Sequence, residues 1–220
     1  MAQAPVRSFK AGVNKFQGPT VTITVGPSKK PFYVHESLIY ASSLFFNKAI
    51  SGSWKESEEH AFELPEDDPQ IFALYSHWLY VGQIPVIVQN STKEEAANNN
   101  YKEYYDLVKA YVLGDKLLDV KFQDSTIQAI VEKSAAPGTD GQRHYPGAGT
   151  IIYAYANTTE SAKIRNLFVD IYVEIAGPRW LTKELPKDFL YSVVEGLMKK
   201  RVPPSKPIKA SDYFLRPSGS

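Results

Sequence analysis

The sequence predicts an α+β fold in which a small three-stranded sheet is capped by a cluster of helices and followed by additional C-terminal helices. Three short strand-like stretches come early in the 220-residue chain, within residues 21–25, 32–34 and 61–64. Beyond residue 69, apolar residues instead recur at the three- and four-residue spacing that gives a helix one buried face. Strands that precede helices in this way are typical of the α+β class.

The first two strands are predicted to form a hairpin. Valine and isoleucine alternate with threonine over residues 21–25, Gly26 and Pro27 interrupt the pattern, and an apolar run resumes at residues 32–34. Alternation with a period of two places every second side chain on one face of a sheet. Turn residues between two such runs are typical of neighbouring antiparallel strands.

Two short helices and the third strand follow. A helical pattern begins near Glu36 and breaks at residues 41–43, before the apolar run at residues 44–50. The polar residues 51–60 are predicted to be a linker. The third strand ends at Pro65, because proline cannot donate a hydrogen bond to a neighbouring strand.

The clearest helix boundaries enclose residues 69–81. Asp68 is a good N-cap, and Pro69 fits the first helical position because the N–H of a residue there has no intrahelical partner. Gly82 can end the helix in the left-handed conformation. The residues predicted to face inward are Ile71, Leu74, Tyr75, Trp78 and Leu79.

The remaining elements are predicted from capping and periodicity. Residues 84–88 form a further extended stretch, and a helix follows that continues to Leu118. The capping boxes that could begin it are Ser91 with Glu94 and Thr92 with Glu95. The next helix covers residues 120–133, and its inward residues are predicted to be Phe122, Ile127, Ile130 and Val131.

The C-terminal part begins with a change of composition. Residues 134–150 carry four glycines and two prolines without periodicity, which predicts a long loop or a subdomain boundary. Two helices with continuous apolar stripes are predicted over residues 164–175 and 189–197. The proline-rich tail, residues 203–220, is expected to be extended or disordered.

Composition and motifs offer no starting point for catalysis or metal binding. The formal net charge of +1 arises from 25 basic and 24 acidic residues, so no overall field attracts a nucleic-acid backbone. There is no cysteine, and the position four residues after His35 is Ile39, which excludes cysteine-ligated metals and the HExxH zinc arrangement. We therefore expect no catalytic, metal-binding or cofactor-binding residues. No apolar run is long enough to span a membrane and no signal-peptide pattern occurs, so we expect no membrane partner and a cytoplasmic and/or nuclear location.

The order of the motifs resembles the BTB/POZ domain family. The family's signature H-x-x-L-I-x-x-x-S-x-x-F is matched by His35, Leu38, Ile39, Ser43 and Phe46. The preceding hairpin and the later stretches FELPEDDPQIF and WLYVGQI look like the family's first strands, its third strand and its helix ending in Tyr-x-Gly. The later helices look like the helical extension of fungal BTB proteins.

The resemblance implies a non-enzymatic protein–protein interaction module. BTB domains form homo- or hetero-oligomers, and many recruit a cullin scaffold so that a substrate is ubiquitinated. Cullin-recruiting members commonly carry a hydrophobic-x-Glu triplet in the linker, which Trp54, Lys55 and Glu56 match. We expect either an adaptor for a cullin-type ubiquitin ligase or a self-associating scaffold or regulatory protein with no cullin role. Trp54 would be an exposed interface anchor or a core residue.

The family also implies a structural role for His35 and a particular domain organisation. In BTB domains this histidine packs at a strand–helix junction, where a neutral imidazole can hydrogen-bond backbone groups left over at the helix start. Gly18-Pro19-Thr20 lacks the acidic residue that many members carry before the first strand, and residues 8–16 are too short for the family's N-terminal helix, which argues against a swapped N-terminal-strand dimer. The segments expected are a short N-terminal segment at 1–18, a BTB/POZ domain at 19–133, the Gly/Pro-rich loop at 134–150, a C-terminal helical extension at 151–202 and the tail at 203–220.

Overall fold

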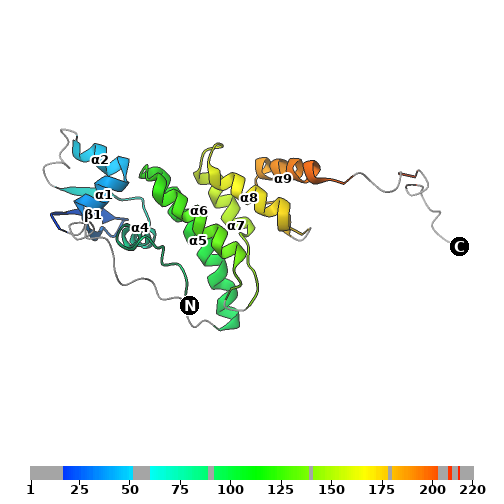
Figure 1. Cartoon of the computed structure of the whole chain (residues 1–220), viewed down its shortest axis with the longest axis horizontal. Helices are drawn as coiled ribbons and strands as arrows, with labels where there is room; N and C mark the ends of the chain where they lie inside the picture. Colours follow the sequence, from blue (N-terminus) through cyan, green and yellow to red (C-terminus); the bar gives the residue numbers. More distant parts are fainter. Residues whose placement is uncertain are drawn as a thin grey trace, which may run out of the picture.

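The computed structural model describes residues 17–51, 60–88, 92–138, 141–177, 180–202, 208–209 and 213. Within these ranges it is an α+β structure with a three-stranded sheet, as predicted (Figure 1). The elements are β1 (Thr20–Val25), β2 (Lys30–His35), α1 (Glu36–Ser42), α2 (Leu44–Ser51), β3 (Ala61–Leu64), α4 (Pro69–Val81), α5 (Lys93–Lys116), α6 (Val120–Ala135), α7 (Ala148–Asn157), α8 (Lys163–Ile175) and α9 (Lys187–Lys200). The N-terminal stretch at residues 8–16 and most of the expected tail lie outside the described residues.

The sheet has the order β2-β1-β3. β1 and β2 form the predicted antiparallel hairpin, with Val21 opposite Val34, whereas β3 runs parallel to β1, with Ile23 beside Phe62. The parallel pairing requires a crossover connection, and α1 and α2 lie within it. The side chains that alternate along β1 on its inward face, those of Val21, Ile23 and Val25, are fully buried.

The predicted break between the first two helices is confirmed at Ser43, whose backbone is extended. This break lets α1 and α2 fold back on each other, so both apply their apolar residues to the sheet. Ile39 of α1 and Phe46 of α2 are fully buried, and the Phe46 ring meets Phe62 of β3 edge-on at 5.1 Å between centroids. The helical pair therefore covers the inward face of the sheet.

The boundaries predicted for α4 are confirmed. Asp68 accepts a hydrogen bond from the Gln70 backbone N–H at 2.9 Å, Pro69 opens the helix, and Gly82 ends it with a φ of 74°. The buried face extends further around the helix than predicted, because Phe72 is also buried. Leu74 and Trp78, which were predicted to face inward, are only half-buried. The buried residues of this helix are Ile71, Phe72, Tyr75 and Leu79.

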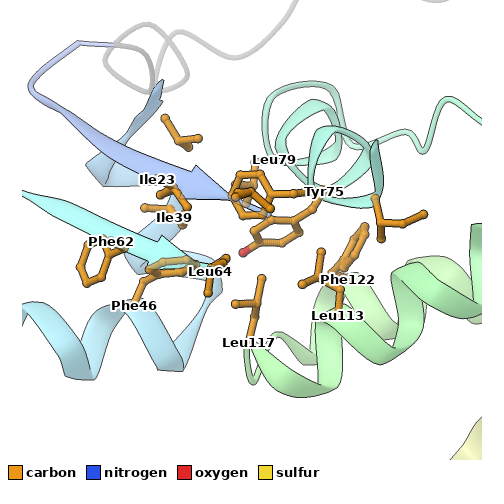
Figure 2. Packing of buried hydrophobic residues seen from close by; sticks show 14 of the residues in the cluster. Ile23, Ile39, Phe46, Phe62, Leu64, Tyr75, Leu79, Leu113, Leu117 and Phe122 are labelled. Atoms are coloured by element: carbon orange, nitrogen blue, oxygen red, sulfur yellow. The ribbon is translucent and has the colours of Figure 1, made fainter. Parts of the chain in front are cut away.

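α4 has this wider buried face because it packs on two sides. The Phe72 ring meets Phe32 of β2 edge-on at 4.8 Å, and the Tyr75 ring meets Phe122 of α6 at 4.9 Å. Figure 2 shows Tyr75 between the sheet residues and the pair formed by Leu113 and Phe122. A helix that contacts a sheet and a second helix buries more than a single stripe.

The long helix α5 contributes to two separate clusters of buried residues. Its start is confirmed at the Thr92–Glu95 capping box, and its 24 residues give it a length of about 36 Å. One face of α5 packs into the core beneath the sheet, and a different face packs into the second cluster, which also contains residues of α7, α8 and α9. Ala110 and Leu113 belong to the first cluster, and Tyr104, Leu107, Val108 and Tyr111 belong to the second.

The structure differs from the expectations for single elements in three places. Residues 84–88, predicted to be an extended stretch, belong to no strand of the sheet. Val131 is 45% exposed, because the buried residues of α6 recur every four positions as Phe122, Thr126 and Ile130. The helix α7 was not predicted; its sequence is apolar almost all round, so its buried stripe of Thr150, Ile151 and Ala154 does not stand out as a period.

The sharing of α5 predicts one cooperative unfolding transition for both clusters. Leu107→Ala in the second cluster and Leu113→Ala in the first should each lower the free energy of unfolding by about 2–5 kcal/mol, because each leaves a cavity among buried side chains. Urea denaturation followed by circular dichroism and by tryptophan fluorescence should give coincident curves for both variants.

The control for this pair is Leu44→Ala, the same substitution at an exposed position of α2. It should change the free energy of unfolding by less than about 0.5 kcal/mol. Two separable transitions, with Leu107→Ala moving only one of them, would show that the clusters unfold independently.

Candidate protein-interaction site

The structure brings the signature residues together around the α1–α2 pair. Leu38, Ile39, Ser43 and Phe46 are all buried. Ile39 and Phe46 fill the core, whereas Ser43 lies at the break between the two helices. None of these four side chains is exposed for a partner to contact, so their role in the described structure is to stabilise the fold.

His35 lies at the junction of β2 and α1, but its hydrogen bonds differ from the expected ones. Its backbone N–H donates to the Tyr80 hydroxyl at 3.0 Å, and its ring Nδ1 lies 2.7 Å from the same oxygen. The side chain does not cap α1. Both bonds connect the end of β2 to the last turn of α4, 45 residues further along the chain.

Ser43 fastens the helical pair to the end of α5. Its hydroxyl donates to the Leu117 carbonyl at 2.7 Å and accepts from the Phe46 N–H at 3.3 Å. The Phe45 N–H donates to the same Leu117 carbonyl at 3.3 Å. A buried hydroxyl that both donates and accepts is satisfied, whereas an apolar residue here would leave the Leu117 carbonyl with one fewer donor.

Asp119 is a structural residue that the sequence analysis missed. Its side chain is fully buried and accepts hydrogen bonds from the Ser42 hydroxyl at 2.5 Å and the Tyr75 hydroxyl at 2.9 Å. Its other oxygen caps α6 by accepting from the Phe122 N–H at 3.0 Å. The only sequence signal was its position just before the predicted helix at 120–133, where an aspartate is a good N-cap.

The surroundings of Asp119 keep the Tyr75 hydroxyl protonated, so that it donates its hydrogen bond to the Asp119 carboxylate. Burial raises the pKa of Tyr75 well above its usual range, and the neighbouring Asp119 carboxylate raises it further. The Tyr75 hydroxyl therefore stays protonated and donates to the carboxylate throughout the physiological pH range. Hydrogen bonds to a charged acceptor are stronger than those between neutral groups.

The candidate partner-binding residues Trp54, Lys55 and Glu56 lie outside the described residues. The described chain leaves the sheet core at Ser51, the last residue of α2, and resumes at His60, next to β3. His60 Nδ1 lies 2.6 Å from Glu36 Oε1 at the start of α1. The triplet therefore belongs to a segment whose two ends are attached to α2 and to β3.

A cleft of about 700 Å³ lies between residues 83–88, α5 and α6. Its one buried lysine is paired: the Lys133 Nζ donates to Glu103 at 2.6 Å and to Asn100 at 2.9 Å. Such pairing stabilises the contact between α5 and α6 but leaves few charges converging on a ligand. Among the described residues, no cluster of three or more histidine, cysteine, aspartate or glutamate side chains is placed to hold a metal ion, and no helix has the length and apolar character needed to cross a membrane.

A scan against known protein-family models and a search of curated proteins both found no match to this chain. The geometry around α1, α2, α4 and the turn at residues 117–119 is thus the basis for any functional argument. That geometry consists of buried structural contacts, with the candidate binding residues in the segment between α2 and β3.

The triple role of Asp119 predicts a large loss of stability on its removal. Asp119→Ala should lower the free energy of unfolding by at least about 3 kcal/mol, because the buried Ser42 and Tyr75 hydroxyls lose their acceptor and α6 loses its cap. Chemical denaturation measures the change directly.

The matched control is Asp68→Ala, which removes the N-cap of α4 and a partly exposed ion pair with Lys109. Its expected effect is about 1 kcal/mol. An Asp119→Ala variant no less stable than Asp68→Ala would contradict the structural role assigned to the buried carboxylate.

Proposed function

We propose that this chain is a BTB/POZ-type protein-interaction module, without catalytic activity of its own, that links a substrate to a cullin-type ubiquitin ligase. The observation that supports the proposal most directly is the order and pairing of the first elements. A β hairpin leads into a pair of short helices, and β3 then returns to lie parallel to β1. α4 follows and ends at Tyr80-Val81-Gly82, as the family pattern would require.

The positions of the signature residues also support the proposal. His35 and Ser43 are polar, yet each makes hydrogen bonds that join elements far apart in the sequence. Because of these hydrogen bonds, polar signature residues can stabilise the fold without forming part of an active site. A histidine whose ring is hydrogen-bonded to a tyrosine of the neighbouring helix serves to position that helix.

The cullin contact is assigned to Trp54, Lys55 and Glu56, by position in the sequence. The triplet falls between α2 and β3, the same place as the linker triplet of cullin-recruiting family members. A tryptophan in a polar segment can serve as an interface anchor, since aromatic residues contribute much of the binding energy at such contacts. The glutamate would add a charge that selects the partner.

The arrangement of the helices suits an adaptor. α5 belongs to both clusters of buried residues, so the sheet end and the α7–α9 end are joined through a continuous helix rather than a loop. A partner held near α2 and a second one held at α7–α9 would keep a fixed separation. Fixed geometry favours transfer reactions because it removes the need to orient the two partners at each encounter.

Titration against the N-terminal repeat region of a cullin tests the proposal. The unmodified chain should bind with sub-micromolar affinity, and Glu56→Arg should weaken binding at least about tenfold, since reversing a charge at an interface opposes a complementary one. The matched control is Glu59→Arg, which makes the same charge change in the same segment outside the triplet and should leave affinity nearly unchanged. A folded chain that does not bind would favour the other family role, a self-associating scaffold with no cullin contact.

Trp54→Ala separates the two possible roles of the tryptophan. If Trp54 is an anchor, the variant should keep its stability while cullin affinity falls by about tenfold or more. A stability loss of about 3–5 kcal/mol would instead identify Trp54 as a core residue. Denaturation and titration of the same variant distinguish the outcomes.

A further inference from the structure

The last helix, α9, carries an apolar stripe on the side that faces away from the protein. Tyr191, Val194 and Met198 are 74%, 53% and 65% exposed. Their spacing of three and four residues aligns them along one face of the helix. An exposed stripe of this kind is more extensive than scattered surface residues and is typical of an interaction surface.

The opposite side of α9 is buried against the rest of the protein. Phe189 and Val193 are buried in the second cluster. Gly196 lies so close to α8 that a Cβ at that position would come within 2.5 Å of Val173 Cγ2. Because α8 fixes this inner side, the exposed stripe cannot be turned inward by rotating the helix.

We propose that the stripe on α9 binds a second copy of this chain, with the two α9 helices antiparallel about a twofold axis. In this arrangement Tyr191 of one helix lies opposite Met198 of the other, and Val194 lies near the axis. Each contact occurs twice, since a twofold axis makes the same surface serve both partners. Contact between a tyrosine ring and a methionine thioether is favourable in addition to the burial of both side chains.

Charge along one flank of the stripe supports a copy of the same chain as the partner. At 100° per residue, Asp188, Glu195 and Lys199 all lie on the same flank. In an antiparallel twofold pair, that flank meets itself, so Asp188 at the start of one helix approaches Lys199 at the end of the other. When Tyr191 lies opposite Met198, Asp188 and the opposing Lys199 are displaced from each other by two residues, about 3 Å along the helix axis. A lysine side chain can span this distance.

The central acidic residue does not oppose this pairing. Glu195 would lie near its own copy, but its carboxylate already pairs with Lys199 of the same helix at 2.9 Å. Lys199 is exposed, and its ammonium can contact Glu195 and the opposing Asp188 together. The helix ends also favour the arrangement, because antiparallel helices place opposite dipole ends side by side.

The expected affinity is micromolar. One pair of helices of 14 residues each buries less area than a typical stable dimer. The inference does not rest on the cullin proposal, since the stripe and the triplet at residues 54–56 belong to different parts of the chain. A dimer that binds no cullin would contradict only that proposal, and a monomer that binds one would contradict only this inference.

Sedimentation of the full chain, from low to high micromolar concentration, tests the dimer. The unmodified chain should shift from monomer to dimer, and Met198→Glu should weaken association at least about tenfold by placing a charge in the stripe. The matched control is Val120→Glu, the same kind of change at an exposed position of α6. It should leave association unchanged.

A mixing experiment identifies the antiparallel pairing. Asp188→Lys and Lys199→Asp should each weaken self-association, because each variant places like charges opposite one another twice. When the two variants are mixed, both pairs become complementary again, so they should associate with each other about as tightly as the unmodified chain does. A change in the folding of single chains could not produce this recovery.

Three results would overturn the proposal. One is a chain that stays monomeric at every concentration, which would leave C-terminal residues of the same chain or a different protein to cover the stripe. Another is a dimer that persists unchanged in Met198→Glu. The third is a mixture of the two charge variants that associates no better than either variant alone.

Discussion

Two buried hydrogen-bond acceptors at the end of α5, one backbone carbonyl and one side-chain carboxylate, connect α1, α2 and α4 to this helix. The Leu117 carbonyl accepts from the Ser43 hydroxyl and the Phe45 N–H, and the Asp119 carboxylate accepts from Ser42 and Tyr75. Each acceptor is buried, so no water replaces a missing donor. The turn at residues 117–119 thereby sets where α5 ends relative to the sheet and to α4.

This constraint extends to the C-terminal helices through α5 itself. Because α5 is a continuous helix, fixing its C-terminal end fixes the direction in which its N-terminal half projects. α7 packs on α5, and α7, α8 and α9 share a second cluster that includes aromatic contacts such as Tyr172 with Phe189 at 4.9 Å. The position of the exposed stripe on α9 is thus set by contacts made around the sheet.

The local features of the fold could be predicted from the sequence. The hairpin, the break at Ser43 and the boundaries of α4 each depend on residues within a few positions of one another. The second cluster was less predictable: α7 lacks a period, and choosing between three- and four-residue spacing misplaced Val131 in α6. Local patterns do not reveal that α4 is covered on two sides, which is why Phe72 was missed.

The candidate site was predictable only in part. The signature identified which residues around α1 and α2 are buried, but not the partners that satisfy their polar groups. Ser42 and Asp119 are 77 positions apart, and the Tyr80 hydroxyl that binds His35 is 45 positions away. A hydrogen bond between distant residues leaves no periodic trace in one sequence, so only the folded structure identifies it.

The strand order β2-β1-β3 has a consequence for how this protein avoids uncontrolled association. In the described part of the chain, β2 and β3 are the two edge strands, and an edge strand offers unpaired backbone groups to any other extended chain. β2 begins with Lys30 and Pro31, and β3 has only four residues. A lysine, a proline and a short strand each discourage the addition of further strands. The edges of the described sheet are therefore poor sites for another extended chain to add, so association by strand addition is disfavoured at both sides.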